Sequence, residues 1–314
     1  MRKIVLSAIA AVALSTSTVM AADMPVKAAP AAPASAWDIA FGSALVSDYI
    51  WRGITQSAHK PSVSAYFEPR YNINKDLQLY AGVAGNSIVF PNRAAAEIDL
   101  YAGIRPTFDK LALDFGVWYY WYPGGICYST GTPGCQPTLL NGNVIKADLS
   151  FWEVYAKATY NVTDSFAVGA TFNYSPSVLN SGADGAYYAV NAKYTGPAFS
   201  NGAKPYISGE VGYWSLGTSD AFYAVAGFPN GIPYKSYATW NLGIGATWKV
   251  FTAEIRYYDT NLSRGDCNAF TSDHTAIFDG SFTSINPGGV GSSWCDARII
   301  GKISADLTAN DNLK

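Results

Sequence analysis

The sequence feature that most constrains the fold is the strict alternation of apolar and polar side chains over residues 97–122. Apolar side chains occupy every second position on both sides of a polar break at 109–110. Because successive side chains of a β-strand point to opposite faces, this run predicts an antiparallel hairpin with one apolar and one polar face. In that register Arg105 and Asp114 lie opposite each other on the polar face, and we expect them to form a cross-strand ion pair.

The length of these strands favours a membrane barrel over a soluble sheet. Each arm has about a dozen residues, more than the five or six of a typical globular strand and close to the nine to eleven of a tilted transmembrane strand. The apolar stripe is aromatic near its ends, at Phe108, Tyr119 and Trp121, which is typical of the girdles at membrane interfaces. The same alternation recurs from Trp37 to Leu307. We therefore predict an all-β fold, an up-and-down antiparallel transmembrane β-barrel of about 12 strands with short periplasmic turns and long external loops.

The composition agrees with a membrane barrel. The chain is 14% charged and 15% aromatic, with 29 Gly and 22 Tyr, and no run of eighteen apolar residues could form a transmembrane helix. The formal net charge of −2 argues against nucleic acid as a partner. The partners that we expect are outer-membrane lipid and lipopolysaccharide, the barrel-assembly machinery during biogenesis, and small hydrophilic solutes. No sequence pattern indicates a cofactor.

The first residues predict export to a Gram-negative outer membrane. Residues 1–22 combine a basic start, an apolar run and small residues, the pattern of a removed signal peptide. Residues 23–36 are rich in Ala and Pro and predict a periplasmic linker, and residues 37–314 form the predicted barrel. An even number of strands places both termini in the periplasm.

Four cysteines in an exported chain predict disulfides, and they permit three pairings. We favour Cys127 with Cys135 and Cys267 with Cys295, because each pair lies within one predicted external loop. A metal site is the alternative, but the spacings lack a CxxC and only His274 is near, so we predict no metal.

Segment 47–57 reads SDYIWRGITQS and is followed by Lys60 and Pro61. It resembles the opening signature of the Gcw_chp family, proteobacterial outer-membrane proteins of unknown function. Further pieces agree in order: Leu79–Val83 with Asn86 and Ser87, Glu97–Gly103, Tyr119–Pro123 and Arg256–Thr260. The resemblance spans nearly the whole mature chain. It implies a barrel in the outer membrane and says little about activity.

The polar face of the predicted strands carries charges of both signs, and we predict that it lines the barrel lumen. The candidates are Asp48, Arg52, Glu68, Arg70, Asp99, Arg105, Asp114, Glu153, Lys157, Glu210, Glu254 and Arg256. Asp48 and Arg52 would lie on the inner face of the first strand, either as a lumen gate or as a lock between strands, while Tyr49 and Trp51 would face lipid. The near balance of charge predicts weak ion selectivity, and inward Tyr and Trp side chains predict a narrow channel. Structural ion pairs in a filled barrel are the alternative interpretation.

Three functions are compatible with these patterns. The first is a porin-like narrow channel for passive diffusion of small hydrophilic solutes. The second is a barrel-anchored surface, structural or adhesion protein whose disulfide-closed loops do the binding. The third is an outer-membrane hydrolase, for which only His59, near Ser57 and Ser62, and His274, after Asp273, could act as imidazole bases. Because proximity in sequence is not a catalytic triad, we predict no catalytic residue and no enzyme activity.

Overall fold

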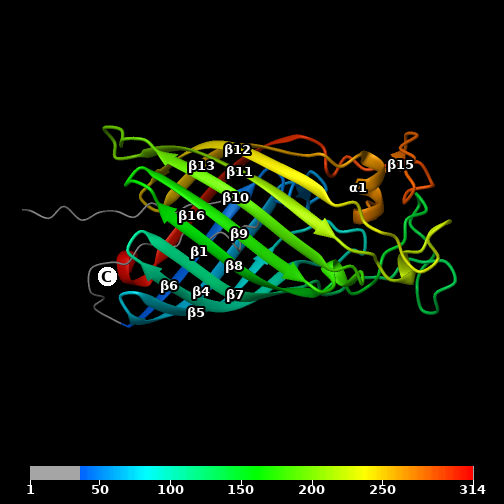
Figure 1. The fold of residues 1–314 in the computed structure, drawn as a ribbon, viewed down its shortest axis with the longest axis horizontal. Helices are drawn as coiled ribbons and strands as arrows, with labels where there is room; N and C mark the ends of the chain where they lie inside the picture. Colours follow the sequence, from blue (N-terminus) through cyan, green and yellow to red (C-terminus); the bar gives the residue numbers. More distant parts are fainter. Residues whose placement is uncertain (1–35, 314) are drawn as a thin grey trace, which may run out of the picture.

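The computed structural model describes residues 36–313, which form a closed antiparallel β-barrel of 12 strands (Figure 1). Each wall strand pairs with the next in sequence, and the last closes on the first, as predicted. The wall strands are β1 (Trp37–Val46), β4 (Ser62–Asn74), β5 (Leu77–Asn86), β6 (Glu97–Phe108), β7 (Leu111–Trp121), β8 (Phe151–Asn161), β9 (Phe166–Ser175), β10 (Gly185–Thr195), β11 (Lys204–Leu216), β12 (Tyr237–Trp248), β13 (Phe251–Thr260) and β16 (Arg298–Thr308). The predicted signal peptide, 1–22, and all but the last residue of the predicted linker, 23–36, lie outside the described residues.

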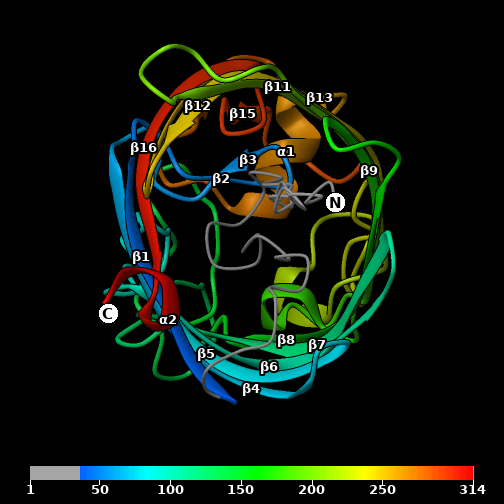
Figure 2. The ribbon, with the colours of Figure 1, turned by 90° about the vertical axis from the view of Figure 1, so that its left-hand side faces the viewer.

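The remaining elements are short and do not form part of the barrel wall. They are the hairpin of β2 (Ile50–Trp51) and β3 (Ile54–Thr55), the pair β14 (Ile277–Phe278) and β15 (Val290–Gly291), the helices α1 (Arg264–Thr271) and α2 (Ala309–Asn312), and two 3-10 turns at Val178–Asn180 and Ala221–Tyr223. Figure 2, a view along the barrel, shows β2, β3 and α1 within the outline of the wall. No helix among residues 36–313 is long and apolar enough to cross a bilayer.

The hairpin of β6 and β7 has the register that the alternation predicts. Phe108 pairs with Leu111, which leaves residues 109–110 as the turn. Arg105 and Asp114 both point inward, and Arg105 Nε donates to Asp114 Oδ2 at 3.2 Å. The predicted cross-strand ion pair is therefore confirmed.

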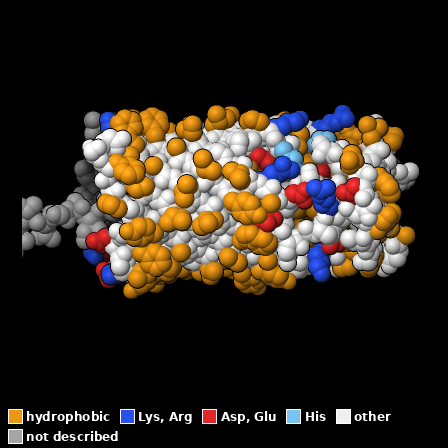
Figure 3. Space-filling model, turned by 90° about the horizontal axis from the view of Figure 1, so that it is seen from above, with side chains coloured by type: hydrophobic (Ala, Val, Ile, Leu, Met, Phe, Trp, Pro, Cys, Tyr) orange, Lys and Arg blue, Asp and Glu red, His pale blue; other side chains and the backbone are white. Residues whose placement is uncertain are grey.

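The outer face of the wall is apolar and exposed, whereas the inner face carries the charged side chains, most of them buried. Val117, Ile244 and Ile255 are each more than half exposed, at 52%, 60% and 59%, while the inward carboxylates of Asp99 and Glu153 are fully buried. Figure 3 shows hydrophobic side chains spread over the face of the barrel wall that is turned to the viewer. An apolar band of this size around a closed barrel would be unfavourable in water and matches the hydrocarbon layer of a membrane.

The connections are mostly short at one end of the barrel and mostly long at the other. The connections at one end, called here the turn end, are residues 75–76, 109–110, 162–165, 196–203 and 249–250. The connections at the other end, called here the loop end, are residues 47–61, 87–96, 122–150, 176–184, 217–236 and 261–297. β1 begins and β16 finishes at the turn end, so the described parts of both termini lie there (Figure 1).

The structure corrects the prediction for the first strand. β1 leaves the wall at Val46, and residues 47–61, called here the plug segment, fold into the mouth of the barrel (Figure 2). Tyr49 and Trp51, which the alternation placed against lipid, are 2% and 4% exposed inside the barrel. The chain reverses at Arg52 and Gly53, whose φ angles are +49° and +82°. A period-two pattern continues through β2, so alternation alone could not distinguish a strand that turns inward from one that stays in the wall.

Candidate functional site

The plug segment is anchored at its tip by a buried ion pair. Arg52 Nη1 and Nη2 donate to the two carboxylate oxygens of Glu153 on β8, each at 2.8 Å. Arg52 is 3% exposed and Glu153 is fully buried. A bidentate Arg–carboxylate pair is a strong charge-assisted contact, and its burial keeps salt and water from screening it.

Aromatic rings from the wall and from the plug segment itself surround the same guanidinium. The Arg52 Cζ atom lies 4.5 Å from the ring centroid of Trp51, 4.6 Å from that of Tyr187 and 4.5 Å from that of Trp214. Tyr237 Oη donates to the carbonyl oxygen of Arg52 at 2.8 Å. These contacts hold the tip of the plug segment against β8, β10, β11 and β12, and cation–π attraction adds to the ion pair.

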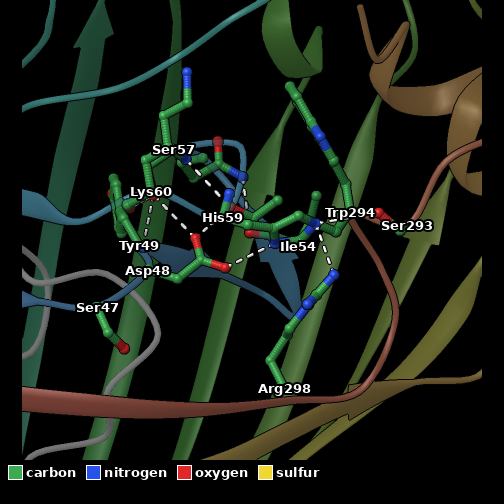
Figure 4. Close-up of polar contacts among 12 residues, drawn as sticks. Ser47, Asp48, Tyr49, Ile54, Ser57, His59, Lys60, Ser293, Trp294 and Arg298 are labelled. Atoms are coloured by element: carbon green, nitrogen blue, oxygen red, sulfur yellow. Dashed lines mark hydrogen bonds and ion pairs between the residues drawn. The ribbon is translucent and has the colours of Figure 1, made fainter. Parts of the chain in front are cut away.

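A second polar cluster lies within the plug segment itself (Figure 4). Asp48 Oδ1 accepts hydrogen bonds from Ser57 Oγ at 2.9 Å and from Thr55 Oγ1. Asp48 Oδ2 lies 2.9 Å from His59 Nδ1. All four residues belong to the plug segment, so these contacts fix its internal shape and orient the His59 ring.

The other nitrogen of His59 contacts the wall. His59 Nε2 lies 2.9 Å from Arg298 Nη2 at the start of β16 and 3.3 Å from Ser293 Oγ in the last loop (Figure 4). Because a guanidinium can only donate, Nε2 is the acceptor, and the ring proton lies on Nδ1 and is donated to Asp48. His59 therefore joins the plug segment to β16.

The residues Asp48, His59 and Ser293 have the order of contacts of a hydrolytic triad. A triad requires the imidazole lone pair to accept the serine proton. Here Arg298 lies closer to Nε2 than the Ser293 hydroxyl does, at 2.9 Å against 3.3 Å. Because Arg298 engages His59 Nε2, this nitrogen is not available as a base for the Ser293 hydroxyl.

A third anchor of the plug segment reaches the β5–β6 wall. Tyr49 Oη donates to Glu97 Oε1, and Tyr122 Oη donates to Glu97 Oε2, each at 2.7 Å. Asn86 Nδ2 bridges Glu97 at 2.9 Å and Asp99 at 3.0 Å. Glu97 was absent from the predicted lumen set, although its place on the polar face two residues before Asp99 was a usable signal.

The other predicted lumen residues form separate clusters on the inner wall. Glu68 accepts from Arg70 at 2.5 Å and from Arg105 at 2.7 Å, and Glu254 accepts from Arg256 at 2.7 Å. Glu210 accepts from Tyr187 at 2.9 Å, and the Lys157 ammonium lies 5.1 Å from the Tyr155 ring centroid. The charges thus occur largely as ion pairs, as the alternative interpretation of the lumen expects.

The inner wall toward the turn end differs from the packed region around the plug segment. It includes polar side chains that are partly exposed to solvent: Thr107, Lys157, Thr159, Thr171, Asn191, Thr247, Thr252, Lys302 and Asp306. Around the plug segment, by contrast, Trp51, Trp214 and Tyr237 are almost completely buried. The barrel is therefore polar and accessible on one side of the plug segment and filled by aromatic side chains around it.

The long loops at the loop end pack together as a cap over the plug segment. The disulfides Cys127–Cys135, called here the third-loop disulfide, and Cys267–Cys295, called here the last-loop disulfide, are both formed, which confirms the predicted pairing. Asn143 Nδ2 donates to Asn268 Oδ1 at 2.7 Å and so joins the two loops. A cavity of about 40 Å³ remains between cap and plug segment, with Trp51, Ile54, Phe90, Leu149, Tyr234 and Phe270 in its lining. Among residues 36–313, no group of three or more His, Cys, Asp or Glu side chains is placed to hold a metal ion.

The closed wall, its apolar outer band and its long-loop end define an outer-membrane β-barrel protein. The sequence matches the model of the family Gcw_chp, described as a bacterial protein of unknown function, over residues 30–284. The chain belongs to this family, as its signature segments predicted. The matched range includes the plug segment and ends before Ser293 and Arg298.

Solved structures of outer-membrane proteins match this chain at low similarity. OmpT of Vibrio cholerae is 12% identical, with 88% of this chain and 98% of that chain covered and a TM-score of 0.36. The NanC porin is 9% identical, with 86% and 98% covered and a TM-score of 0.40. An outer-membrane channel from Pseudomonas putida F1 is 9% identical, with 91% and 99% covered and a TM-score of 0.40. A comparison with curated protein sequences finds no match.

Proposed function

We propose that this protein is a porin-like narrow channel for passive diffusion of small hydrophilic solutes, closed in the present conformation by the plug segment. The observation that carries the proposal is the polar, partly exposed inner wall toward the turn end, represented by Thr107, Thr171 and Asn191. A barrel that served only as an anchor could fill this region with apolar side chains. A polar wall is wetted, as the wall of a diffusion channel must be.

The way in which the plug segment is held also supports a removable closure. Arg52, Ala58 and His59 have φ angles of +49°, +49° and +62°, a region that side chains other than Gly rarely adopt. Each such residue costs of order 1–3 kcal/mol. Departure of the tip from the mouth frees Arg52 to leave this region, whereas Ala58 and His59 keep it with the internal shape of the segment. A modest weakening of its polar anchors is then enough to shift the balance toward an open channel.

The orientation and the surroundings of the barrel belong to the same proposal. The loop end faces the cell exterior and the turn end faces the periplasm of a Gram-negative cell, so that both termini are periplasmic. The outer wall contacts outer-membrane lipid and lipopolysaccharide, and the assembly machinery inserts the barrel. The channel has no enzyme activity, which the engagement of His59 by Arg298 at 2.9 Å supports.

Conductance of the refolded full chain in planar bilayers tests the channel directly. The matched variant replaces residues 48–60 with a short Gly-Ser linker, and heat-dependent gel mobility and circular dichroism verify that its barrel folds. We expect rare, small openings for the natural chain and steady conductance for the variant, with weak preference between K⁺ and Cl⁻. A folded variant that does not conduct would show that the lumen is not a channel.

The packing of the external loops favours a second function, that of a surface anchor. The two disulfides and the bond between Asn143 and Asn268 give the cap a fixed shape that a binding surface could use. A variant that lacks residues 126–146 separates the two functions. A surface anchor would lose binding to a cell-surface partner, whereas a channel would keep or increase its conductance.

A further inference from the structure

We propose that His59 makes the closure acid-sensitive: protonation of its imidazole breaks the link between the plug segment and β16 and shifts the channel toward its open state. This inference rests on the proposed channel function. It adds a physical signal, the external pH, that controls the position of the plug segment.

The two nitrogens of the His59 imidazole contact different parts of the protein. Nδ1 contacts Asp48 at 2.9 Å, and both residues move with the plug segment. Nε2 contacts Arg298 at 2.9 Å, and Arg298 belongs to the barrel wall. The Nε2 contacts with Arg298 and with Ser293 of the last loop are lost when the segment leaves the mouth, whereas the Asp48 contact moves with it. The protonation state of Nε2 therefore affects the closed state more than the open state.

The two protonation states have opposite effects on the wall contact. Neutral His59 offers its Nε2 lone pair to the Arg298 guanidinium. Protonated His59 carries N–H groups on both nitrogens, so Nε2 can no longer accept, and two positive groups face each other. The Asp48 contact survives protonation, because a carboxylate accepts from either form. The closed state thus favours neutral His59, because only the neutral ring can make the Arg298 contact, and acid weakens closure.

The charged groups around this cluster are few. The imidazole side chain is 24% exposed, and the contacts recorded for its ring atoms in the described chain are Asp48, Ser293 and Arg298. On the other side of Asp48, a cavity of about 20 Å³ is lined by Glu254, Arg256 and Lys302, among others, and Glu254 and Arg256 are paired with each other. Lys60 follows His59 on the exposed edge of the plug segment. The only positive group in direct contact with Nε2 is Arg298, so it is the group that opposes protonation.

The other anchors limit the size of the response. Arg52 remains charged at every pH of interest, and its contact with Glu153 does not involve His59. Acid therefore removes one anchor of several. We expect the open probability in planar bilayers to rise about tenfold between pH 8 and pH 5, which corresponds to about 1.4 kcal/mol.

The chain offers a matched control, because it has 2 histidines. His59→Gln keeps a donor and an acceptor but cannot titrate, and we expect it to remain closed at both pH values. His274→Gln removes the other imidazole, which lies in the last loop beside Trp294 and has its pKa lowered by burial. This variant should keep the full pH response. Arg298→Gln removes the positive partner while keeping an acceptor for protonated His59, so its pH response should disappear as well.

A second measurement makes the inference independent of conductance. Backbone hydrogen exchange of residues 47–61 is compared between the natural chain and His59→Gln at the same pH, so that the intrinsic exchange rate cancels. The natural chain should exchange about tenfold faster than the variant at pH 5 and equally at pH 8. Equal exchange at both pH values, or a pH response that persists in His59→Gln, would overturn the role of His59. If exchange responds as expected but the chain without residues 48–60 does not conduct, the acid-sensitive plug stands and the channel function fails.

Discussion

Replacement of Glu153 by Gln tests whether the ion pair at the tip of the plug segment keeps the mouth closed. The substitution preserves the size of the side chain but leaves the Arg52 guanidinium buried without its counter-charge. Breaking a buried pair by removal of one partner costs about 3–5 kcal/mol. The amide oxygen of Gln can still accept one hydrogen bond, so we take the lower value, about 3 kcal/mol.

Most of this cost can be relieved without unfolding the barrel, because Arg52 belongs to a segment that can move into water. We therefore expect the equilibrium between closed and open states to shift by about a hundredfold toward the open state. Open probability in planar bilayers measures the shift. Arg52→Met combined with Glu153→Leu should close better than Glu153→Gln alone, since a buried pair replaced on both sides by apolar groups of similar volume is often neutral or stabilising.

Glu68→Gln provides the control for general damage to the wall. Glu68 is also fully buried and accepts from two arginines, Arg70 and Arg105, but no recorded contact joins it to the plug segment. This variant should lower the unfolding temperature of the barrel and leave the open probability unchanged. If Glu153→Gln opened the channel no more than Glu68→Gln, the ion pair would not be an anchor of the closed state.

Three further predictions test the wall, the cap and the lumen. Val117→Arg, on the lipid face, should destabilise the barrel by about 2–4 kcal/mol in urea titrations in bilayers, whereas Thr171→Arg, on the inner wall, should cost little; equal costs would contradict the register. Serine replacement of the last-loop disulfide, which closes 28 residues, should cost about 3.6 kcal/mol of unfolding free energy, against about 2.5 kcal/mol for the third-loop disulfide, which closes 8; the reverse order in calorimetry would refute this. The chain without residues 48–60 should show a reversal potential near zero in a KCl gradient, because the inner charges nearly balance; a strongly selective lumen would give a large potential.

The wall of this barrel could be predicted from the sequence because the pattern that specifies it depends only on neighbouring residues. A strand that faces lipid on one side and a polar lumen on the other must alternate at every residue, and a slip of one position would turn every charge into the bilayer. Arg105 and Asp114 are 9 residues apart across a tight turn, so their pairing follows from the register alone. The disulfides were predictable for a related reason, since each joins two positions of one loop.

The plug segment could not be predicted in the same way. Its residues 49–52 continue the alternation of β1, and what redirects them is the backbone conformation at Gly53, where an added Cβ would collide with Thr239 and Thr260. These threonines are distant in sequence. Arg298, which holds His59, is 239 residues away from it, and Glu153 is 101 residues from Arg52. A single sequence contains no local signal for contacts of that range.

The segment that most resembles the family signature, residues 47–57, lies in the plug segment and not in the wall. Its polar side chains are used either to shape the segment, as Asp48 and Ser57 are, or to hold it in the mouth, as Arg52 is. A wall strand needs only alternation, which many sequences satisfy, whereas an inserted segment needs particular donors and acceptors at particular positions. We propose that insertion of this segment into the mouth of the barrel accounts for the specificity of the signature. Substitution of Arg52 or Asp48 should accordingly change gating while the wall strands, which depend on their own alternation, still fold.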